Sequence, residues 1–292
     1  EKSFIEKGDA SVLQSRTKNQ TEGLVAVQEF LEMVNNYLSV GGTEEAQVLI
    51  DQAVALGNPF AASPLVYYYK AYVCLLEGNR GDAGAQLENA NSLSHINQYP
   101  LRIEEVKMFD TLTAAFADNA FLHYHYGNLL YYIGQKEHGL AEWTRSTELD
   151  GTFAVALRNV GFAYGQKGEW QKAMGYYDRA IKANPDDALL FTESDKIYES
   201  ANVDAAARLK RLESNIKTVM KHDDAVMRLL SLYNVTGKYD KAIQIMHNRH
   251  FHLWEGGGQI HGIYADSHML KGMTLLAKKN YQKAIQELSL IH

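Results

Sequence analysis

Histidine side chains bind metal ions and move protons near neutral pH, and five of the eleven in this chain lie between His247 and His268. A metal site needs several ligands that converge at fixed distances, and histidine pairs on one helix usually lie four residues apart. His250 and His252 flank Phe251 instead, and no carboxylate is spaced with them as a second set of ligands. We therefore predict no metal site and no bound cofactor, and we expect His268 to be a core residue of its helix.

A glycine run is the second feature that could do chemistry. It follows the Trp254-Glu255 pair and consists of Gly256, Gly257 and Gly258. The run lacks the Lys-Ser/Thr pair of a phosphate-binding loop, and no strand precedes it. We interpret the stretch at about 250–260 as an irregular connector in which Trp254 is a buried anchor and the glycines permit positive φ. The alternative is a ligand-contacting loop with an exposed Trp254.

The composition excludes several partners. The net charge of −6 gives no basic surface for nucleic acid or for an anionic membrane, and no run of about 20 apolar residues could span a bilayer. The lone Cys74 lies in an apolar helical run and is expected to be a buried small hydrophobe. The first residues, EKSFIEKGDA, lack the apolar core of a secretion signal, and the missing initial Met suggests a piece of a longer protein.

Residues 120–185 can be written twice at an offset of 34 residues. Small, turn-forming, aromatic and helix-breaking residues recur in the same order: Gly127 as Gly161, Gly134 as Gly168, Gly139 as Ala173, Trp143 as Tyr177, Ser146 as Ala180 and Gly151 as Pro185. This pattern predicts two antiparallel helices that pack closely through their small residues.

The rest of the chain follows the same pattern less strictly. Residues 1–20 are predicted to be a lead-in segment and residues 21–292 a helical repeat array. The register breaks at about 98–117, where IEEVKMFDTLTAAF predicts an inserted amphipathic helix. After Pro185 the pattern has Asp195 where a glycine is expected, and Asn202 at the turn.

The period and its residues resemble the tetratricopeptide repeat (TPR), and AVALRNVGFAYGQKGEWQKAMGYYDRAIKANP meets nearly every position of that pattern. The resemblance implies an all-α fold, a right-handed α-solenoid of about seven helix pairs plus one inserted helix. It also implies a protein or peptide partner, which makes this chain an interaction scaffold rather than an enzyme.

In that family the second, fifth, ninth and twelfth residues of each unit line the concave face. Applied to the units that begin at Pro64, Ala120 and Ala154, this implies an aromatic-lined groove formed by Tyr68, Tyr72, Tyr124, Asn128, Tyr131, Arg158 and Phe162. Such a groove suits an extended peptide, a helix or stacked sugar rings. The alternative is that some of these tyrosines are inter-repeat core.

The family's clamp for a C-terminal carboxylate is matched only in part. Asn128 and Asn159 occupy its two Asn positions, but Tyr124, Leu189 and Glu193 stand where it has basic residues. We therefore do not predict this clamp.

A narrower resemblance covers most of the chain. Segments such as YHYGNLLYYIGQKEHGLAEW and RHFHLWEGGGQIHGIYADSHMLKG are similar to the C-terminal TPR region of large bacterial proteins with an N-terminal β-sandwich domain of unknown function. This resemblance implies two hypotheses. The groove binds a protein or peptide, which includes that absent domain, or the region assists a carbohydrate-processing enzyme whose catalytic β domain lies outside this sequence.

Overall fold

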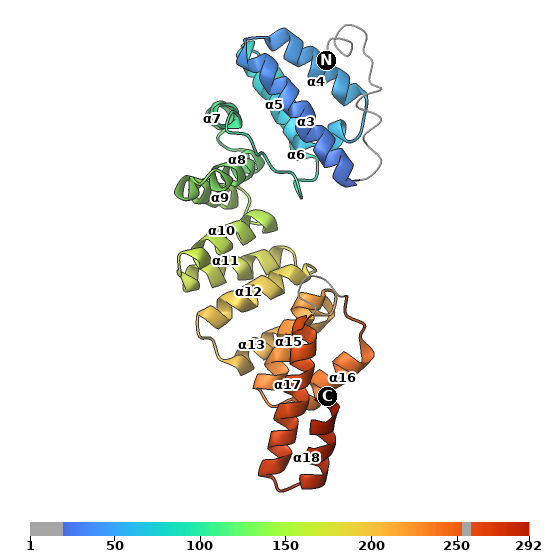
Figure 1. Ribbon diagram of the computed structural model, residues 1–292. Coiled ribbons are helices and arrows are strands. Elements are labelled where there is room, and N and C mark those ends of the chain that lie inside the picture. Colours follow the sequence, from blue (N-terminus) through green and yellow to red (C-terminus); the bar gives the residue numbers. More distant parts are fainter. Residues whose placement is uncertain (1–19, 253–257, 292) are drawn as a thin grey trace. The chain divides into compact units, whose positions relative to one another are not determined.

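The computed structural model describes residues 20–252 and 258–291, and every regular element in these ranges is a helix (Figure 1). The chain divides into two compact units, residues 1–151 and 152–292. The boundary falls between the two clearest sequence copies. The all-α helical-repeat fold expected from the sequence is confirmed.

From residue 20 onward, the first unit contains three helix pairs and one additional helix. The pairs are α3 (Gln20–Ser39) with α4 (Thr43–Ala55), α5 (Pro64–Leu76) with α6 (Arg80–Asn91), and α8 (Ala120–Tyr132) with α9 (Lys136–Leu149). A short 3₁₀ turn, η1 (Phe60–Ala62), precedes α5, and α7 (Glu105–Ala115) lies between the second and third pairs. Helix α7 falls inside the predicted insert.

The described part of the second unit, residues 152–252 and 258–291, contains four pairs. These are α10 (Ala154–Gln166) with α11 (Trp170–Ala183), α12 (Ala188–Ser200) with α13 (Ala205–Ser214), α15 (Asp223–Val235) with α16 (Tyr239–Asn248), and α17 (Gly258–Ala277) with α18 (Tyr281–Leu288). The short helix α14 (Ile216–Val219) precedes α15, and η2 (Ser289–Ile291) follows α18. Across the described ranges this gives the seven pairs that the sequence predicts.

Small residues set the distance between the two helices of a pair. A Cβ atom added to Gly127 would lie 2.4 Å from Cδ1 of Trp143 and 2.9 Å from the carbonyl oxygen of Gly139. At the equivalent place in the next pair, a Cβ on Gly161 would lie 2.9 Å from Cδ2 of Tyr177. These contacts leave no room for a side chain, because real Cβ atoms do not approach other heavy atoms so closely. The aromatic residue on the second helix therefore packs directly on the glycine backbone of the first.

The turns within the pairs use residues that tolerate positive φ. Gly134 has φ of +91° and Gly168 has φ of +73°, which are left-handed values that favour glycine. Asn202 takes φ of +57° at the turn between α12 and α13, where the sequence has no glycine. Asparagine is among the non-glycine residues that most readily adopt this conformation, so the drifted unit keeps the same turn.

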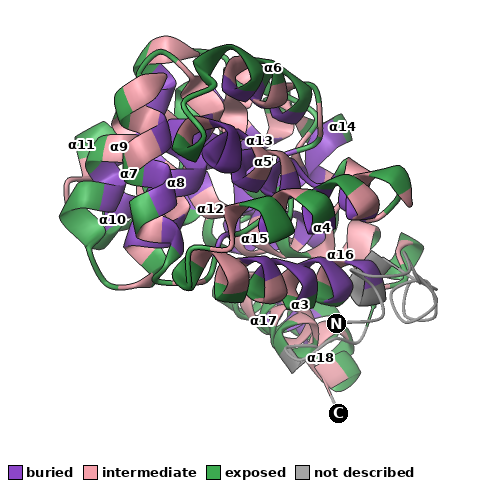
Figure 2. Ribbon diagram, turned by 90° about the horizontal axis from the view of Figure 1, so that it is seen from above, coloured by how far each residue is buried: buried purple, intermediate pink, exposed green. Residues whose placement is uncertain are grey.

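Buried residues lie on the faces that the helices turn toward one another, while exposed residues lie on their outer faces (Figure 2). In the second unit, Ala180 is fully buried against Leu157, Tyr177 and Leu190. Ala173 is also fully buried. Both alanines thus occupy the close-contact positions that the repeat pattern predicts.

We expect Ala180→Leu to lower the free energy of unfolding by about 1–3 kcal/mol, because the added atoms overpack a filled site. Gly175→Leu on the same helix is the matched control, since a Cβ there meets nothing within 4 Å. Urea unfolding of the two variants and the parent measures the difference. An Ala180→Leu protein as stable as the parent would contradict the packing described here.

Candidate functional site

Two of the predicted groove tyrosines lie in the core of the first unit. Tyr68 is fully buried and Tyr124 is 1% exposed. The Tyr68 ring makes edge contacts with Phe109 of α7 at 5.8 Å and with His125 at 5.3 Å between ring centroids. The inserted helix packs on the face of α5 that the pattern assigns to the groove. The prediction that Tyr68 and Tyr124 line an accessible surface is therefore wrong, and the alternative of core tyrosines holds for both.

The remaining predicted residues of the first unit are also held by internal contacts. Tyr72 is buried, with 7% of its surface exposed. Asn128 Oδ1 accepts a hydrogen bond from Trp143 Nε1 at 2.9 Å, and the Tyr131 ring stacks on Trp143 at 4.7 Å. These partners fix Asn128 and Tyr131 as supports of the α8–α9 pair.

Arg158 and Phe162 belong to the second unit, so they are described apart from Tyr124 and Asn128. Arg158 donates from Nε to Glu193 Oε2 at 2.7 Å and makes a second bond to the same carboxylate. Tyr177 donates to Glu193 at 3.2 Å. Phe162 is 40% exposed on α10.

The tract of Trp254, Glu255, Gly256 and Gly257 lies outside the described residues, so both interpretations of this loop stay predictions. His268 is 2% exposed and lies 2.7 Å from Glu287, which confirms it as a core residue. Within the described ranges, no group of three or more His, Cys, Asp or Glu side chains is placed to hold a metal ion. No helix there is long and apolar enough to cross a membrane.

A hollow in the second unit, which we call the unit 2 cavity, has a volume of about 700 Å³. It lies among the first helices of three pairs, α12, α15 and α17. The segment just before α15 and the segment just after α16 complete its lining. The residues that line it are Thr192, Lys196, Lys221, His222, Asp223, Asp224, Met227, Arg228, Ser231, Arg249, Phe251, His252, Gln259, Ile260 and Ile263.

The floor of the unit 2 cavity is apolar. Met227 is half-buried on α15, and Phe251, Ile260 and Ile263 are partly buried against the core of the second unit. When an apolar side chain of a ligand covers this floor, the binding free energy becomes more favourable by about 25 cal/mol for each Å² of apolar surface removed from water.

One wall of the cavity is held by a charge cluster around Asp223. This carboxylate accepts two bonds from Arg249, at 2.8 and 2.6 Å, and one from the backbone N–H of His252 at 3.0 Å. Burial alone would raise the pKa of Asp223, but the bonds from His252 and Arg249 outweigh it and hold this pKa below its ordinary value. The cluster fastens residues 249–252 to the first turn of α15.

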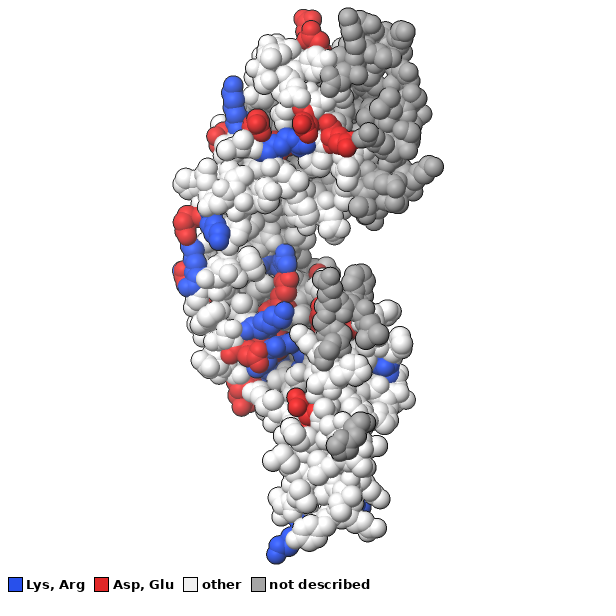
Figure 3. Space-filling model, viewed as in Figure 1, with Lys and Arg blue, Asp and Glu red and all other residues white. Residues whose placement is uncertain are grey.

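The other charged groups of the cavity are less constrained. Lys196 is exposed on α12 and has no carboxylate partner among the described residues. Lys221 pairs with Asp186 at 2.6 Å, and both side chains are more than half exposed. Figure 3 shows acidic and basic side chains interspersed on the visible face of each unit. The cavity differs, because four of its lining residues are Lys or Arg and only two are Asp.

Sequence reasoning missed this cavity, although the signal was present. In the units that begin at Ala188 and Asp223, the fifth and ninth residues are Thr192 with Lys196 and Met227 with Ser231. All four line the cavity. Fifth and ninth positions of these two units therefore face one cavity, whereas in the first unit α7 packs on the corresponding face of α5.

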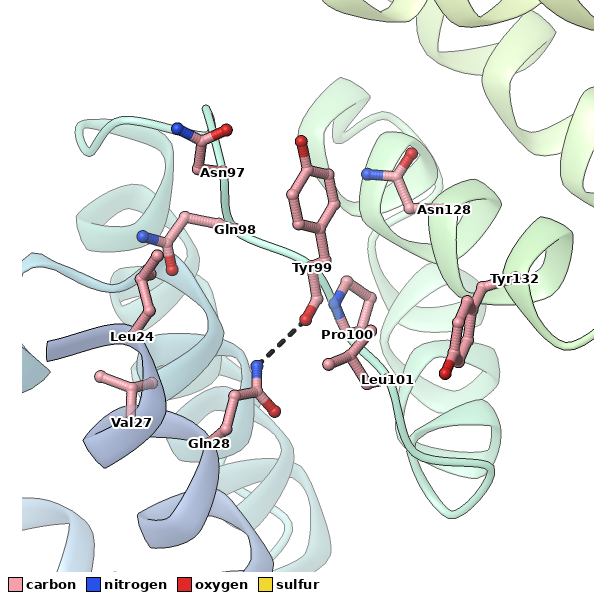
Figure 4. Close-up of a pocket in the computed structure, with 10 residues that line it drawn as sticks. All are labelled: Leu24, Val27, Gln28, Asn97, Gln98, Tyr99, Pro100, Leu101, Asn128 and Tyr132. Carbon is pink, nitrogen blue, oxygen red and sulfur yellow. Dashed lines mark hydrogen bonds between the residues drawn. The ribbon is translucent and has the colours of Figure 1, made fainter. Parts of the chain in front are cut away.

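A smaller hollow of about 250 Å³ lies in the first unit between α3, α8 and the connector that precedes α7 (Figure 4). Leu24, Val27 and Gln28 come from α3, and Asn128 and Tyr132 from α8. The connector supplies residues 97–101 and is tied to α3 by a bond from Gln28 Nε2 to the carbonyl oxygen of Tyr99 at 3.1 Å. The lining carries no charged side chain.

Comparison with solved structures finds proteins of low identity. YrrB, described as a TPR protein with an unusual peptide-binding site, is 19% identical over 63% of this chain and 90% of its own, with a TM-score of 0.47. PilF of Pseudomonas aeruginosa is 15% identical over 82% and 97%, with a TM-score of 0.45. The C-terminal part of a TPR repeat-containing protein from Cytophaga hutchinsonii is 13% identical over 89% and 94%, with a TM-score of 0.44.

The comparison with family models gives one match within the second unit. Residues 154–187, which form α10 and α11, match the model of the tetratricopeptide repeat. The matched segment coincides with the second sequence copy, and its helices pack through Gly161 and Ala173 as the repeat pattern predicts. This part of the chain is therefore similar to the tetratricopeptide repeat.

Proposed function

We propose that this chain is an interaction scaffold that binds an extended segment of a protein partner in the unit 2 cavity. One observation carries the proposal: the first helices of three successive pairs present side chains to a single cavity of about 700 Å³. Stacked helical repeats form extended binding surfaces in this way, since each unit adds one helix to the same face.

The chemistry of the cavity supports a peptide rather than a compact cofactor. Recognition surfaces commonly combine an apolar centre with a polar rim, and the apolar side chains Met227, Ile260 and Ile263 lie beside Lys196 and Arg228. The Asp223 cluster and the bonds of Arg228 to Glu199 and Asp195 fix the walls before a ligand binds. Such preorganisation lowers the entropic cost of binding.

We expect Ser231→Trp to weaken peptide binding strongly, because the indole would occupy part of the cavity from α15. Short peptides selected from a random displayed library against the parent protein serve as probes. The expected result is a loss of at least about tenfold in affinity. Val235→Trp is the matched control, since Val235 is 72% exposed on the same helix and does not line the cavity.

Thermal melts of both variants separate a blocked cavity from a damaged fold. Two outcomes would refute the proposal: a library that yields no binders, or selected peptides that bind the parent and the folded Ser231→Trp variant equally well.

Two finer hypotheses from the sequence remain open to the same assay. One is that the partner is a β domain of the same polypeptide, and the other is that the Trp254 tract contributes to a carbohydrate site. The peptide segment is the occupant that the cavity residues favour, because the lining combines charged and apolar side chains.

A further inference from the structure

We infer that the segment bound in the unit 2 cavity is acidic, with Asp or Glu side chains that reach Lys196 and Lys221 beside an apolar side chain that covers Met227 and Ile263. This inference rests on the proposed function and names the class of its ligand. The recognised groups are side-chain carboxylates within a protein segment.

The charge of the cavity is opposite to that of the chain. Four lining residues are Lys or Arg and two are Asp, which gives the cavity a formal charge of +2. The whole chain carries −6. A local reversal of sign in an otherwise acidic protein attracts acidic partners to this place and repels them from the remaining surface.

The two arginines of the cavity are already committed to internal carboxylates. Arg228 bonds to Asp195 at 2.7 Å and to Glu199 at 2.8 Å, and Arg249 bonds to Asp223. These pairs shape the walls but leave little of the guanidinium charge for a ligand. The lysines are therefore the groups that a ligand carboxylate can engage.

Both lysines can respond to a ligand. Lys196 is exposed and unpaired among the described residues. Lys221 is 52% exposed, and its partner Asp186 is 81% exposed. An exposed pair of this kind contributes little to stability, so Lys221 can exchange Asp186 for a ligand carboxylate at small cost.

Asp224 is the acidic group that opposes this assignment. It lies in the first turn of α15, 3.9 Å from the His222 ring nitrogen, and its backbone N–H bonds to His222. A carboxylate in the first turn of a helix interacts favourably with the free N–H groups there. The N-terminus of α15 thus partly offsets the negative charge of Asp224. The lysines therefore keep the net charge at the edge of the cavity positive.

The test compares three short peptides that are blocked at both ends, so that neither terminus carries charge. Each has a central Leu-Phe pair, flanked by Glu in the first peptide, by Gln in the second and by Lys in the third. We expect the Glu peptide to bind at least about tenfold more tightly than the Gln peptide, measured by fluorescence anisotropy. Its affinity is expected to fall with added salt.

Lys196→Glu is expected to lower the affinity for the Glu peptide by about tenfold or more and to raise the affinity for the Lys peptide. Lys182→Glu is the matched control, because Lys182 is exposed on α11 outside the cavity and the change in net charge is the same. Equal binding of the Glu and Gln peptides, or equal effects of the two variants, would overturn the inference.

The outcomes distinguish this inference from the proposed function. If the peptides bind the Ser231→Trp variant more weakly than the parent but the Glu peptide is not preferred, the proposed function stands. The inference of an acidic ligand is then rejected. If the Gln peptide bound more tightly with an unblocked C-terminus than with a blocked one, the recognised group would be the terminal carboxylate. That result would also overturn the inference. If no peptide responds to Ser231→Trp, the proposed function itself fails.

Discussion

Asp195→Ala is expected to lower the free energy of unfolding of the second unit by about 3–5 kcal/mol, because it removes the buried carboxylate that pairs with two guanidinium groups. Asp195 is 1% exposed. It accepts bonds from Arg208 Nε at 2.9 Å, from Arg208 Nη2 at 2.8 Å and from Arg228 Nε at 2.7 Å. One carboxylate therefore ties α12 to both α13 and α15.

The position of Asp195 explains why the loss should be large. In the clearer repeats this place holds Gly127 or Gly161, whose backbone is covered by an aromatic ring of the second helix. The α12–α13 pair lacks that contact and has the ion cluster in its place. Arg208 is only 8% exposed in its side chain, so water cannot replace the missing carboxylate.

Hydrogen exchange of the α12, α13 and α15 amides measures the loss. Asp186→Ala is the matched control, since its pair with Lys221 is exposed and should contribute little to stability. Removal of Arg208 together with Asp195 should recover part of the stability, because fewer charges are then left unpaired. If the amides of these helices exchanged at the same rate in the Asp195→Ala variant as in the parent, the cluster would not be the link that holds the helices together.

The sequence predicts the elements of this fold better than the contacts between them. Gly127, Gly161 and Ala180 were identified from local spacing, because close approach of two helices demands a small residue at each repeat. The pattern marks Asp195 as a departure from a glycine position, but it does not name Arg208 and Arg228. Those partners depend on which faces α13 and α15 turn toward α12, and helical periodicity does not specify that.

The candidate site shows the same limit. The inserted helix is predicted within residues 98–117, yet its docking on α5 is not, because the irregular connector before it sets where Phe109 falls. That docking buries Tyr68 and removes the first unit from the predicted groove. Within the described residues of the second unit, the same positional rule points to Met227 and Ser231, which line the cavity.

Lowering the pH from 7 to 5 is expected to destabilise the first unit by about 2 kcal/mol through His95, with an additional contribution from His125. His95 Nδ1 lies 2.9 Å from His125 Nε2, and both residues are buried. The His95 ring stacks on Phe121 at 4.1 Å, and His125 contacts Tyr68. The pair joins the connector before α7 to α8.

Burial lowers the pKa of His95 to about 4, although a backbone bond at Asn91 acts in the opposite direction. Burial and the neighbouring His95 hold the pKa of His125 well below its ordinary value. The unfolded chain therefore binds protons at a higher pH than the folded unit does. The stability that these neutral rings contribute is complete above about pH 6.5 and is lost as the pH falls toward 4.

The second unit should respond at lower pH. Burial acts to raise the pKa of Glu199, but Arg228 and Arg208 outweigh it and hold this pKa below the ordinary value. The bonds of Glu287 to Lys271 and His268 likewise outweigh its burial. Depressed carboxylate pKa values contribute stability that persists above the unfolded pKa of about 4.3. These two carboxylates should therefore lose little of their contribution between pH 7 and pH 5.

Urea unfolding at several pH values measures the difference, with Trp143 as the reporter of the first unit in a background where Trp170 and Trp254 are replaced by Phe. His95→Gln should reduce the dependence on pH, because an amide can still bond to His125 but does not titrate. The double variant with His125→Gln should remove most of it. His138→Gln, on the exposed surface of α9, should leave it unchanged. A first unit whose unfolding free energy is the same at pH 7 and pH 5, or a dependence that survives in the double variant, would show that the buried pair does not govern its acid stability.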